Sequence, residues 1–319
     1  MRLTAQQVYD KLIEEDQILT LQGQISFNLG DVSIIVKQKD VVGNIMQEWL
    51  QGWLDARGIE YAPSENTQMP PDFFLNPDDR TKNLLEVKAF NRNASPGFDI
   101  ADFRMYQNEI IDKPYMLDVE YLIFGYDMSD DGIVVIKDVW LKKVWEITRR
   151  MKDWPLNLQI KEGHVHKIRP GVWYSDRNVD YPMFQSIEHF ISAVEECVYR
   201  NDETRSLAPT WKNRFIESYR REKGVTLAIP RWYEIEESYN YKKIKQVEKA
   251  QADVNKTEVA LEAAQAKLDS KKGEMTLLLE KGMTARLERV ETDVRKYEEK
   301  VSALVEKLAK QREKLDSLQ

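Results

Sequence analysis

The sequence predicts an α/β (α+β) fold for residues 1–241 and an antiparallel coiled-coil hairpin for residues 242–319. Three observations support this prediction. Segments of helical and strand periodicity alternate along the first part of the chain. One expected strand, residues 84–90, is apolar on both faces, as in the middle of a sheet. After residue 242 apolar residues recur every seven positions, and neither proline nor tryptophan occurs.

The N-terminal part of the chain predicts two helices around one strand. Thr4 can cap a first helix over residues 4–22, where apolar residues recur near helical spacing. Apolar and other residues alternate over residues 31–38, which predicts a strand. A second helix is expected over residues 41–56, with Gly58 ending it.

Two short segments that carry carboxylates follow this second helix. The sequence PPDFF occupies residues 70–74, LLEVKAF occupies residues 84–90, and the residues between them are rich in turn formers. This pattern predicts a hairpin with Asp72 on one arm and with Glu86 and Lys88 on the other.

Glu86 and Lys88 point to the same side of the expected strand, because residues two apart share a face. Their neighbours are apolar, and burying two charges costs free energy unless the charges are paired or bind something. Two carboxylates beside a lysine suit a divalent cation with a water molecule next to it. The alternative is a surface hairpin in which Glu86 and Lys88 form an ordinary ion pair.

Pro71-Asp72 followed by Glu86-Val87-Lys88 resembles the PD-(D/E)XK nuclease superfamily, whose best-known members are type II restriction endonucleases. The resemblance covers roughly residues 30–140 and is most specific at the two acids and the lysine. It implies a restriction-endonuclease-like mixed sheet flanked by helices. It also implies a homodimer that uses Mg²⁺ to hydrolyse phosphodiester bonds in both strands of a short, specific double-stranded DNA site.

The resemblance implies a role for each residue. Asp72 and Glu86 would hold Mg²⁺ together with the carbonyl group of Val87, and Lys88 would orient the attacking water and stabilise the transition state. Glu48, in the expected helix before the hairpin, would assist as a glutamate that faces the metal site. The alternative for Glu48 is an exposed helical glutamate without a catalytic role.

The rest of the body is expected to continue with mixed elements. The expected helices cover residues 99–112, a segment ending near 151, and 186–200; the expected strands cover residues 121–127, 133–139 and parts of 156–174.

Basic residues near these elements are candidates for DNA binding. Arg92 and Arg104 follow the hairpin and could meet phosphates near the scissile bond. The segment 161–177 is the most basic stretch of the body and contains two aromatic residues. Its candidates are Lys161, His164, His166, Lys167, Arg169 and Arg177. The alternatives are a sheet edge protected by charges and polar contacts on a half-exposed strand. A metal pair at the two histidines lacks a third ligand at suitable spacing.

Two heptad patterns characterise residues 242–319. The first runs from Val247 to Leu268 and the second from Leu287 to Leu315, and their registers do not join. Glycines at positions 273 and 282 lie between them, which predicts two helices folded back on each other. One continuous helix with a stutter is the alternative. This tail is expected to serve dimerisation or DNA binding.

Composition limits the class of protein. The net charge of −7 divides into −10 for residues 1–241 and +3 for the tail, which argues against a protein that coats nucleic acid but allows local phosphate contacts. A single cysteine, Cys197, excludes an internal disulfide and a cysteine-based zinc site. The absence of a signal pattern and of a membrane-length apolar run predicts a cytoplasmic protein with no membrane partner. Alternative functions are a repair or junction-resolving nuclease and a coiled-coil binding module for DNA or protein on a nuclease-like scaffold.

Overall fold

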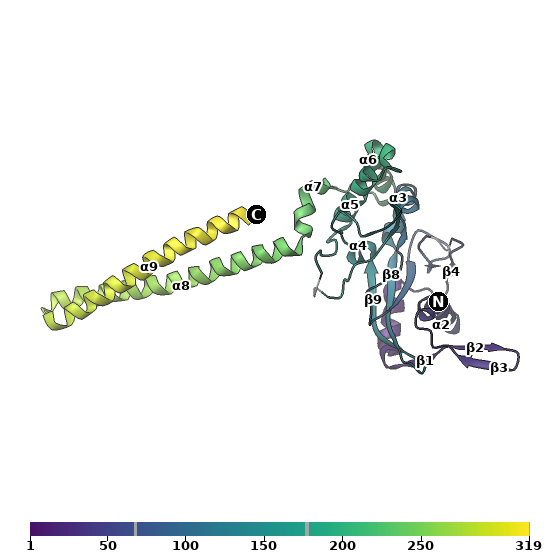
Figure 1. Cartoon of the computed structure of the whole chain (residues 1–319), viewed down its shortest axis with the longest axis horizontal. Helices are drawn as coiled ribbons and strands as arrows, with labels where there is room; N and C mark the ends of the chain where they lie inside the picture. The colour runs from purple at the N-terminus through teal and green to yellow at the C-terminus, as the bar shows by residue number, and fades with distance from the viewer. Residues whose placement is uncertain (67–68, 176–178, 319) are drawn as a thin grey trace. The chain divides into compact units, whose positions relative to one another are not determined.

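A computed structural model describes residues 1–66, 69–175 and 179–318 of the chain (Figure 1). The chain forms two compact units, a body over Met1–Tyr239 and a second unit from Asn240 onward. Each unit is described by itself.

The body contains both helices and strands along its whole length. Its α-helices are α1 (Ala5–Asp10), α2 (Val41–Ala56), α3 (Phe103–Asp112), α4 (Val144–Ile147), α5 (Ile187–Arg200), α6 (Ala208–Lys223) and α7 (Trp232–Ile235). Its strands are β1 (Gln22–Gln24), β2 (Ser26–Leu29), β3 (Val32–Ile35), β4 (Ala62–Pro63), β5 (Phe73–Phe74), β6 (Leu84–Asn91), β7 (Ala101–Asp102), β8 (Glu120–Met128), β9 (Ile133–Lys143), β10 (Leu158–Lys161) and β11 (His164–Ile168). Short 3₁₀ or π turns cover Lys11–Glu15, Ile18–Thr20, Pro114–Asp118, Arg205–Leu207 and Glu236–Tyr239.

A six-stranded sheet with the order β1-β9-β8-β6-β5-β4 forms the centre of the body. The sheet is mixed, because β6 and β8 run parallel while the other neighbours are antiparallel. Alternate residues of β6 face two separate cores. Leu84 and Phe90 pack in the core that contains residues of α3 and α5, whereas Leu85 and Val87 pack in the core that contains residues of α2. The predicted mixed sheet flanked by helices is therefore confirmed.

The N-terminal prediction is partly wrong. The expected helix over residues 4–22 begins as predicted, with the Thr4 side chain accepting a hydrogen bond from the backbone of Gln7. It ends as a π turn at Glu15, because Gln17 adopts a left-handed conformation with φ of 49°. The chain then enters β1 and β2, neither of which was predicted.

Several other elements lie where they were expected. The helix over 41–56, the strands near 121–127 and 133–139, and the helix over 186–200 are present as α2, β8, β9 and α5. Two helices are shorter than expected. Residues 99–102 are loop and strand, so α3 starts at Phe103, and β9 extends to Lys143, which leaves only the short α4 before residue 151.

The second unit is an antiparallel pair of long helices, as the heptads predicted. The helices are α8 (Tyr241–Glu280) and α9 (Thr284–Leu318). Gly282 lies in the turn between them with φ of 64°, whereas Gly273 lies inside α8.

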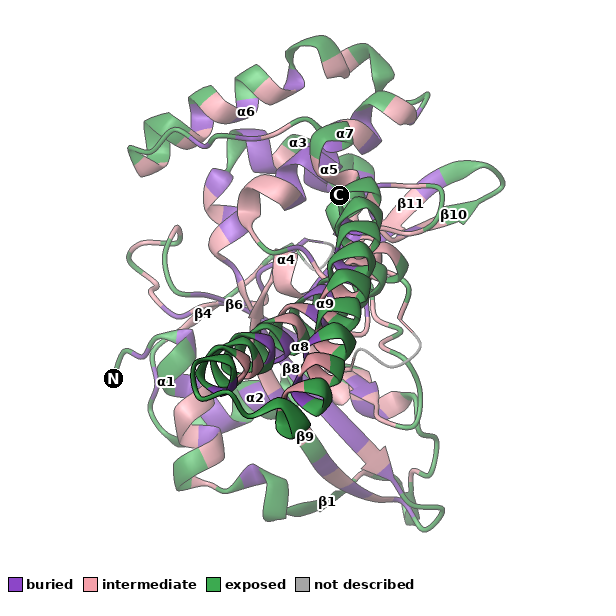
Figure 2. Cartoon of the chain, turned by 90° about the vertical axis from the view of Figure 1, so that its left-hand side faces the viewer, coloured by how far each residue is buried: buried purple, intermediate pink, exposed green. Residues whose placement is uncertain are grey.

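Apolar residues of both heptads bury themselves within this pair. One cluster joins Ala250 and Val254 to Leu308 and Leu315, and a second joins Leu268 and Leu278 to Val290 and Val294. Figure 2 shows that exposed residues cover most of the remaining surface of both helices. No helix in the described part of the chain is both long and apolar enough to cross a membrane.

Candidate active site

The predicted hairpin is present and brings Asp72 beside the strand that contains Glu86. Strands β5 and β6 are antiparallel, with Phe73 opposite Leu85. The backbone N–H of Asp72 donates to the carbonyl of Leu85 at 3.0 Å. The side chain of Asp72 in turn accepts a hydrogen bond from the backbone N–H of Val87 at 2.8 Å. These two bonds fix the Asp72 carboxylate at the middle of β6.

Glu86 and Lys88 lie on one face of β6 and form an ion pair. Lys88 Nζ lies 2.6 Å from Glu86 Oε1, and the two side chains are only 21% and 5% exposed. This is not the surface pair of the alternative interpretation, because both side chains are largely buried and β6 is an inner strand of the sheet, between β8 and β5. A charged pair placed inside a sheet is costly unless its remaining lone pairs are used.

Burial changes the protonation of all three residues. Burial raises the pKa of Glu86 to about 7, although Lys88 opposes this shift and Asp72 adds to it. Burial also raises the pKa of Asp72, against the Val87 hydrogen bond and the Lys88 charge. Burial alone would lower the pKa of Lys88, but Glu86, Asp72 and Asp99 together raise it above its ordinary value. The site therefore keeps a protonated lysine next to carboxylates that hold their protons more tightly than usual.

Glu86 Oε2 is buried and has no hydrogen-bond partner in the described part of the chain. The hydroxyl of Tyr121 is also buried without such a partner, and Tyr121 lies opposite Glu86 in the β6–β8 register. Hard oxygen atoms of this kind fit Mg²⁺, which needs only one or two carboxylates and keeps several water molecules. Among the described residues no three acidic, histidine or cysteine side chains gather into a metal cluster. A cation here would therefore depend on two carboxylates, a backbone carbonyl and water.

A groove of about 660 Å³ opens beside Lys88. Lys88 lines it from β6, Asp99 lines it from the loop before β7, and Asn44 and Gln47 line it from α2. Asp99 and the two α2 amides were missed by sequence reasoning, since only the packing of α2 against β6 reveals their position. Glu48 is exposed on α2 and is not among the residues that line this groove.

Arg92 is held just beyond β6 by aromatic rings. Its guanidinium group lies 4.1 Å from the ring centre of Tyr174 and 5.3 Å from that of Trp140, and its Nε donates to Asp138. A Cβ at Gly125 would lie 2.5 Å from the Cδ of Arg92, so a glycine is needed beneath this side chain. Arg92 thus has a fixed position near the groove. Phe90 and Phe98, which belong to the same hydrophobic cluster as Trp140 and Tyr174, are among the residues that line the groove.

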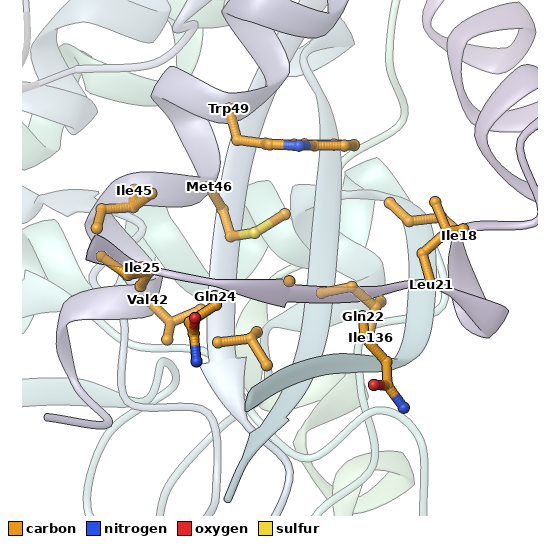
Figure 3. Close-up of a pocket in the computed structure, with 12 residues that line it drawn as sticks. Ile18, Leu21, Gln22, Gln24, Ile25, Val42, Ile45, Met46, Trp49 and Ile136 are labelled. Atoms are coloured by element: carbon orange, nitrogen blue, oxygen red, sulfur yellow. The ribbon is translucent and has the colours of Figure 1, made fainter. Parts of the chain in front are cut away.

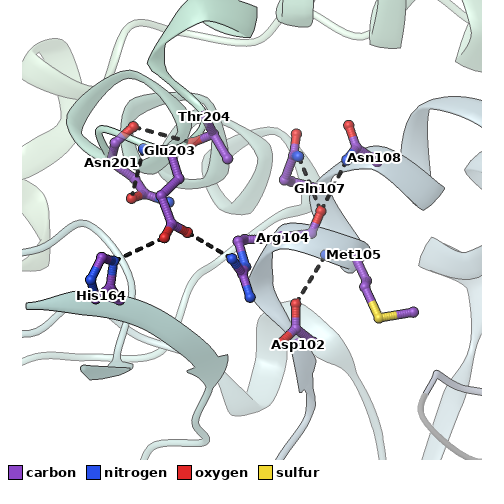
Figure 4. Close-up of polar contacts among 9 residues, drawn as sticks. All are labelled: Asp102, Arg104, Met105, Gln107, Asn108, His164, Asn201, Glu203 and Thr204. Carbon is purple, nitrogen blue, oxygen red and sulfur yellow. Dashed lines mark hydrogen bonds and ion pairs between the residues drawn. The ribbon is translucent and has the colours of Figure 1, made fainter. Parts of the chain in front are cut away.

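Arg104 and His164 are brought together by one acidic residue. Arg104 donates to Glu203 Oε2 at 3.0 Å, and His164 Nδ1 lies 2.9 Å from Glu203 Oε1 (Figure 4). Both basic residues lie on elements away from β6, on α3 and at the start of β11. Neither lines the groove beside Lys88.

The other candidates for DNA binding lie on the β10–β11 hairpin and the loop that follows it. Lys161 is exposed, and His166 and Lys167 are half-buried. Arg169 donates to the carbonyl of Gly97 at 2.8 Å and also to Asp99, so it supports the loop that lines the groove. The last candidate, Arg177, lies outside the described residues.

Comparison with known proteins identifies the family. The model of the NgoBV restriction endonuclease family matches residues 2–239, which is almost the whole body.

The chain belongs to the NgoBV restriction endonuclease family.

Individual relatives agree. The chain is 64% identical over 242 residues to the type II restriction enzyme NlaIV of Neisseria lactamica, across 76% of this chain and all of that relative. It is 62% identical over 162 residues to the type II restriction enzyme NgoBV of Neisseria gonorrhoeae, across 51% of this chain and 92% of that relative. A solved structure of the NlaIV restriction endonuclease aligns with a TM-score of 0.73 over 75% of this chain and 98% of that chain. The sequence-based assignment to type II restriction endonucleases is confirmed.

The helical pair lies outside the family match. The family match ends at residue 239, and α8 begins at Tyr241. The type II restriction enzyme NlaIV is matched along its whole length by 242 residues of this chain. It is therefore too short to contain the helical pair as well. The restriction endonuclease body is therefore a unit that relatives have without this tail.

Proposed function

We propose that this chain is a Mg²⁺-dependent, site-specific endonuclease that hydrolyses both strands of a short double-stranded DNA sequence, with its active centre at Asp72, Glu86 and Lys88. The main observation behind this proposal is the state of the buried Glu86 carboxylate. One of its oxygens pairs with Lys88, and the other has no hydrogen-bond partner in the described part of the chain. Family membership supports the reaction class.

Residues of β6, with Asp72 just before β5, would supply the ligands and orient the water. Asp72 and Glu86 would hold Mg²⁺ with the carbonyl of Val87, and the cation would supply Lewis acidity for the attacking water and for charge on the phosphate. Lys88, kept protonated by its acidic neighbours, would position the attacking water and stabilise negative charge as the phosphate is attacked. The products expected for such a site are a 5′-phosphate and a 3′-hydroxyl.

DNA would approach along the groove beside Lys88. Arg92 would reach a phosphate from its aromatic support, and Lys161, His166 and Lys167 would offer further contacts from β10 and β11. Arg104 and His164 would join them once phosphate competes for Glu203. We also propose a homodimer, because two related active sites are needed to cut both strands of a symmetric site together.

Digestion of a sequenced plasmid tests the proposal. With Mg²⁺ the protein should produce discrete fragments whose mapped ends carry 5′-phosphates, and a chelator should abolish cutting. Lys88→Ala, assayed in parallel, should leave the plasmid intact. Selective cutting of branched DNA, with the plain plasmid untouched, would instead indicate a junction-resolving enzyme.

A further inference from the structure

The β2–β3 ribbon carries several large apolar side chains that are exposed. The two strands pair antiparallel, with Phe27 opposite Ile34 and Leu29 opposite Val32. Because residues two apart share a face, these four apolar side chains form one face of the ribbon, and the other face is mainly serine and asparagine. Phe27, Leu29 and Val32 are 55%, 71% and 64% exposed. The body thus has an amphipathic ribbon that projects from it (Figure 1), and the apolar face of this ribbon is exposed.

An apolar cavity of about 210 Å³ adjoins the base of this ribbon. Ile25, the residue before β2, lines it together with Leu21 and with Ile45, Met46 and Trp49 of α2. Figure 3 shows these side chains converging on the cavity from the segment before β2 and from α2. Each chain therefore has both a projecting apolar ribbon and an apolar cavity.

The charge of this region indicates a protein partner rather than DNA. Residues 17–36 contain a single charged side chain, Asp31, although 32% of the whole chain is charged. A surface that binds the phosphate backbone needs lysine or arginine, and this one has neither. Depletion of charge is instead the property of the core of a protein–protein interface.

The exposed area is sufficient for a stable dimer. The four apolar residues of that face, with Leu21 and Trp49 at the cavity, present on the order of 600 Å² of surface, which is the lower end for a stable interface. A standard stable interface takes about 800 Å² from each partner. Apolar patches of this size are uncommon on monomers and mark binding surfaces.

A second copy of the chain is the occupant that these features favour. A twofold axis lets the ribbon of each protomer lie over the cavity of its partner, so both features are used twice. The helical pair is a weaker candidate for dimerisation, since its apolar seam is filled by its own two helices. A relative of body length has no such pair, whereas the ribbon lies within the family match.

We propose that the β2–β3 ribbon and the cavity beside it form the twofold interface of a homodimer of this protein. The role that we give this dimer, cleavage of both DNA strands, rests on the proposed function. The observations that locate the interface do not. No side chain of this interface is one to which we assign a catalytic or DNA-binding role.

Charge substitutions on the full-length protein test the interface. Leu29→Lys and Val32→Lys place a charge on the apolar face, and both positions are exposed, so the body should fold unchanged by circular dichroism. Ser33→Lys places the same charge on the opposite face of the same strand and is the matched control. Sedimentation equilibrium should give a dimer for the wild type and for Ser33→Lys. The dimer dissociation constants of Leu29→Lys and Val32→Lys should be at least 100-fold higher than that of the wild type.

The outcomes separate this inference from the proposed function. A dimer that dissociates on Val32→Lys but never cuts DNA supports the interface and refutes the nuclease proposal. A wild type that is monomeric at every concentration, with and without DNA, overturns the interface. The proposed interface is also overturned if Leu29→Lys and Val32→Lys stay dimeric. It is overturned as well if the protein is a monomer and these substitutions weaken its binding to DNA.

Discussion

Lys88 Nζ lies 2.6 Å from Glu86 Oε1 on the inner face of a central strand. This pair explains how β6 accommodates two charges among apolar residues: each charge compensates the other, and the second oxygen of Glu86 remains available. Removing one member of a buried pair leaves an uncompensated charge, at a typical cost of about 3–5 kcal/mol. Variants at these positions therefore need stability controls as well as activity assays.

Lys88→Ala should reduce DNA cleavage by at least about 100-fold, which is the scale of one catalytic group. DNA affinity should change little, since the role proposed for this lysine is in the chemical step and not in binding the duplex. Single-turnover cleavage and a binding titration separate the two effects. Lys82→Ala is the matched control, because Lys82 is exposed on the turn of the same hairpin and pairs only locally with Asp79. Cutting at the wild-type rate by Lys88→Ala would remove this residue from the active centre.

Asp72→Asn should fold normally and lose its response to Mg²⁺. The asparagine side chain retains an oxygen that can accept the hydrogen bond from the Val87 N–H, so the hairpin keeps its geometry. It lacks the negative charge that a divalent cation requires. Cleavage measured over a range of Mg²⁺ concentrations checks this. Asp78→Asn, on the exposed turn, should behave as the wild type, and a normal Mg²⁺ response in Asp72→Asn would exclude Asp72 as a ligand.

Mg²⁺ affinity should fall as the pH drops below about 7. The pKa of Glu86 is raised to about 7 by burial, so below that pH the carboxylate is protonated and cannot bind a cation. Because the folded pKa exceeds the unfolded one, Glu86 stabilises the metal-free protein below about pH 4.5, and this contribution is lost as the pH rises through about 7.

Thermal unfolding checks this dependence without relying on activity. Addition of Mg²⁺ should raise the melting temperature more at pH 8 than at pH 6, since binding to the folded state alone is stabilising. Asp72 and Lys88 face the same carboxylate, so Glu86→Gln is needed to assign the effect. That variant should show a small shift that is the same at both pH values. An equal shift at pH 6 and pH 8 in the wild type would show that Glu86 is not the titrating ligand.

The geometry of the proposed active centre was predictable from sequence because its residues lie close together along the chain. Asp72, Glu86 and Lys88 belong to one hairpin, and alternation along a single strand places Glu86 and Lys88 on one face. Asp99 and Gln47 could not be placed, because they reach the groove only through the packing of a loop and of α2 against β6.

The segment before the apolar ribbon shows the opposite limit of sequence reasoning. Val8, Leu12, Ile13 and Leu19 recur near helical spacing, so residues 4–22 were assigned to one helix. The left-handed residue at Gln17, which no propensity indicates, ends that helix and sends the chain into β1. The heptads of the tail, by contrast, did predict a helical pair, because the packing of two such helices depends on a local periodicity that can be read from the sequence.

Lys167→Ala and Arg169→Ala should have different effects on DNA. Lys167 is not among the described residues that line the groove, so its loss should weaken binding to all sequences alike and reduce the salt dependence by about one phosphate contact. Arg169 holds Gly97 and Asp99, so its loss should slow cleavage more than it weakens binding. Binding titrations at several salt concentrations, with cleavage rates at saturating DNA, distinguish these effects. Identical profiles for the two variants would mean that Arg169 does not act through the Asp99 loop.

A chain that ends at Tyr239 should remain a dimer and cut DNA at the same sites as the full-length protein. The helical pair fills its own apolar seam, and a relative of body length lacks it. The pair does carry a net charge of +3, while the body carries −10, so its removal should weaken DNA binding modestly. That difference should shrink as salt is raised, because it arises from screened charges. Light scattering gives the mass of the shortened chain, and titrations at two salt concentrations give its affinity. A monomeric shortened chain would place dimerisation in the helical pair, and unchanged affinity at low salt would show that the pair makes no contribution to binding DNA.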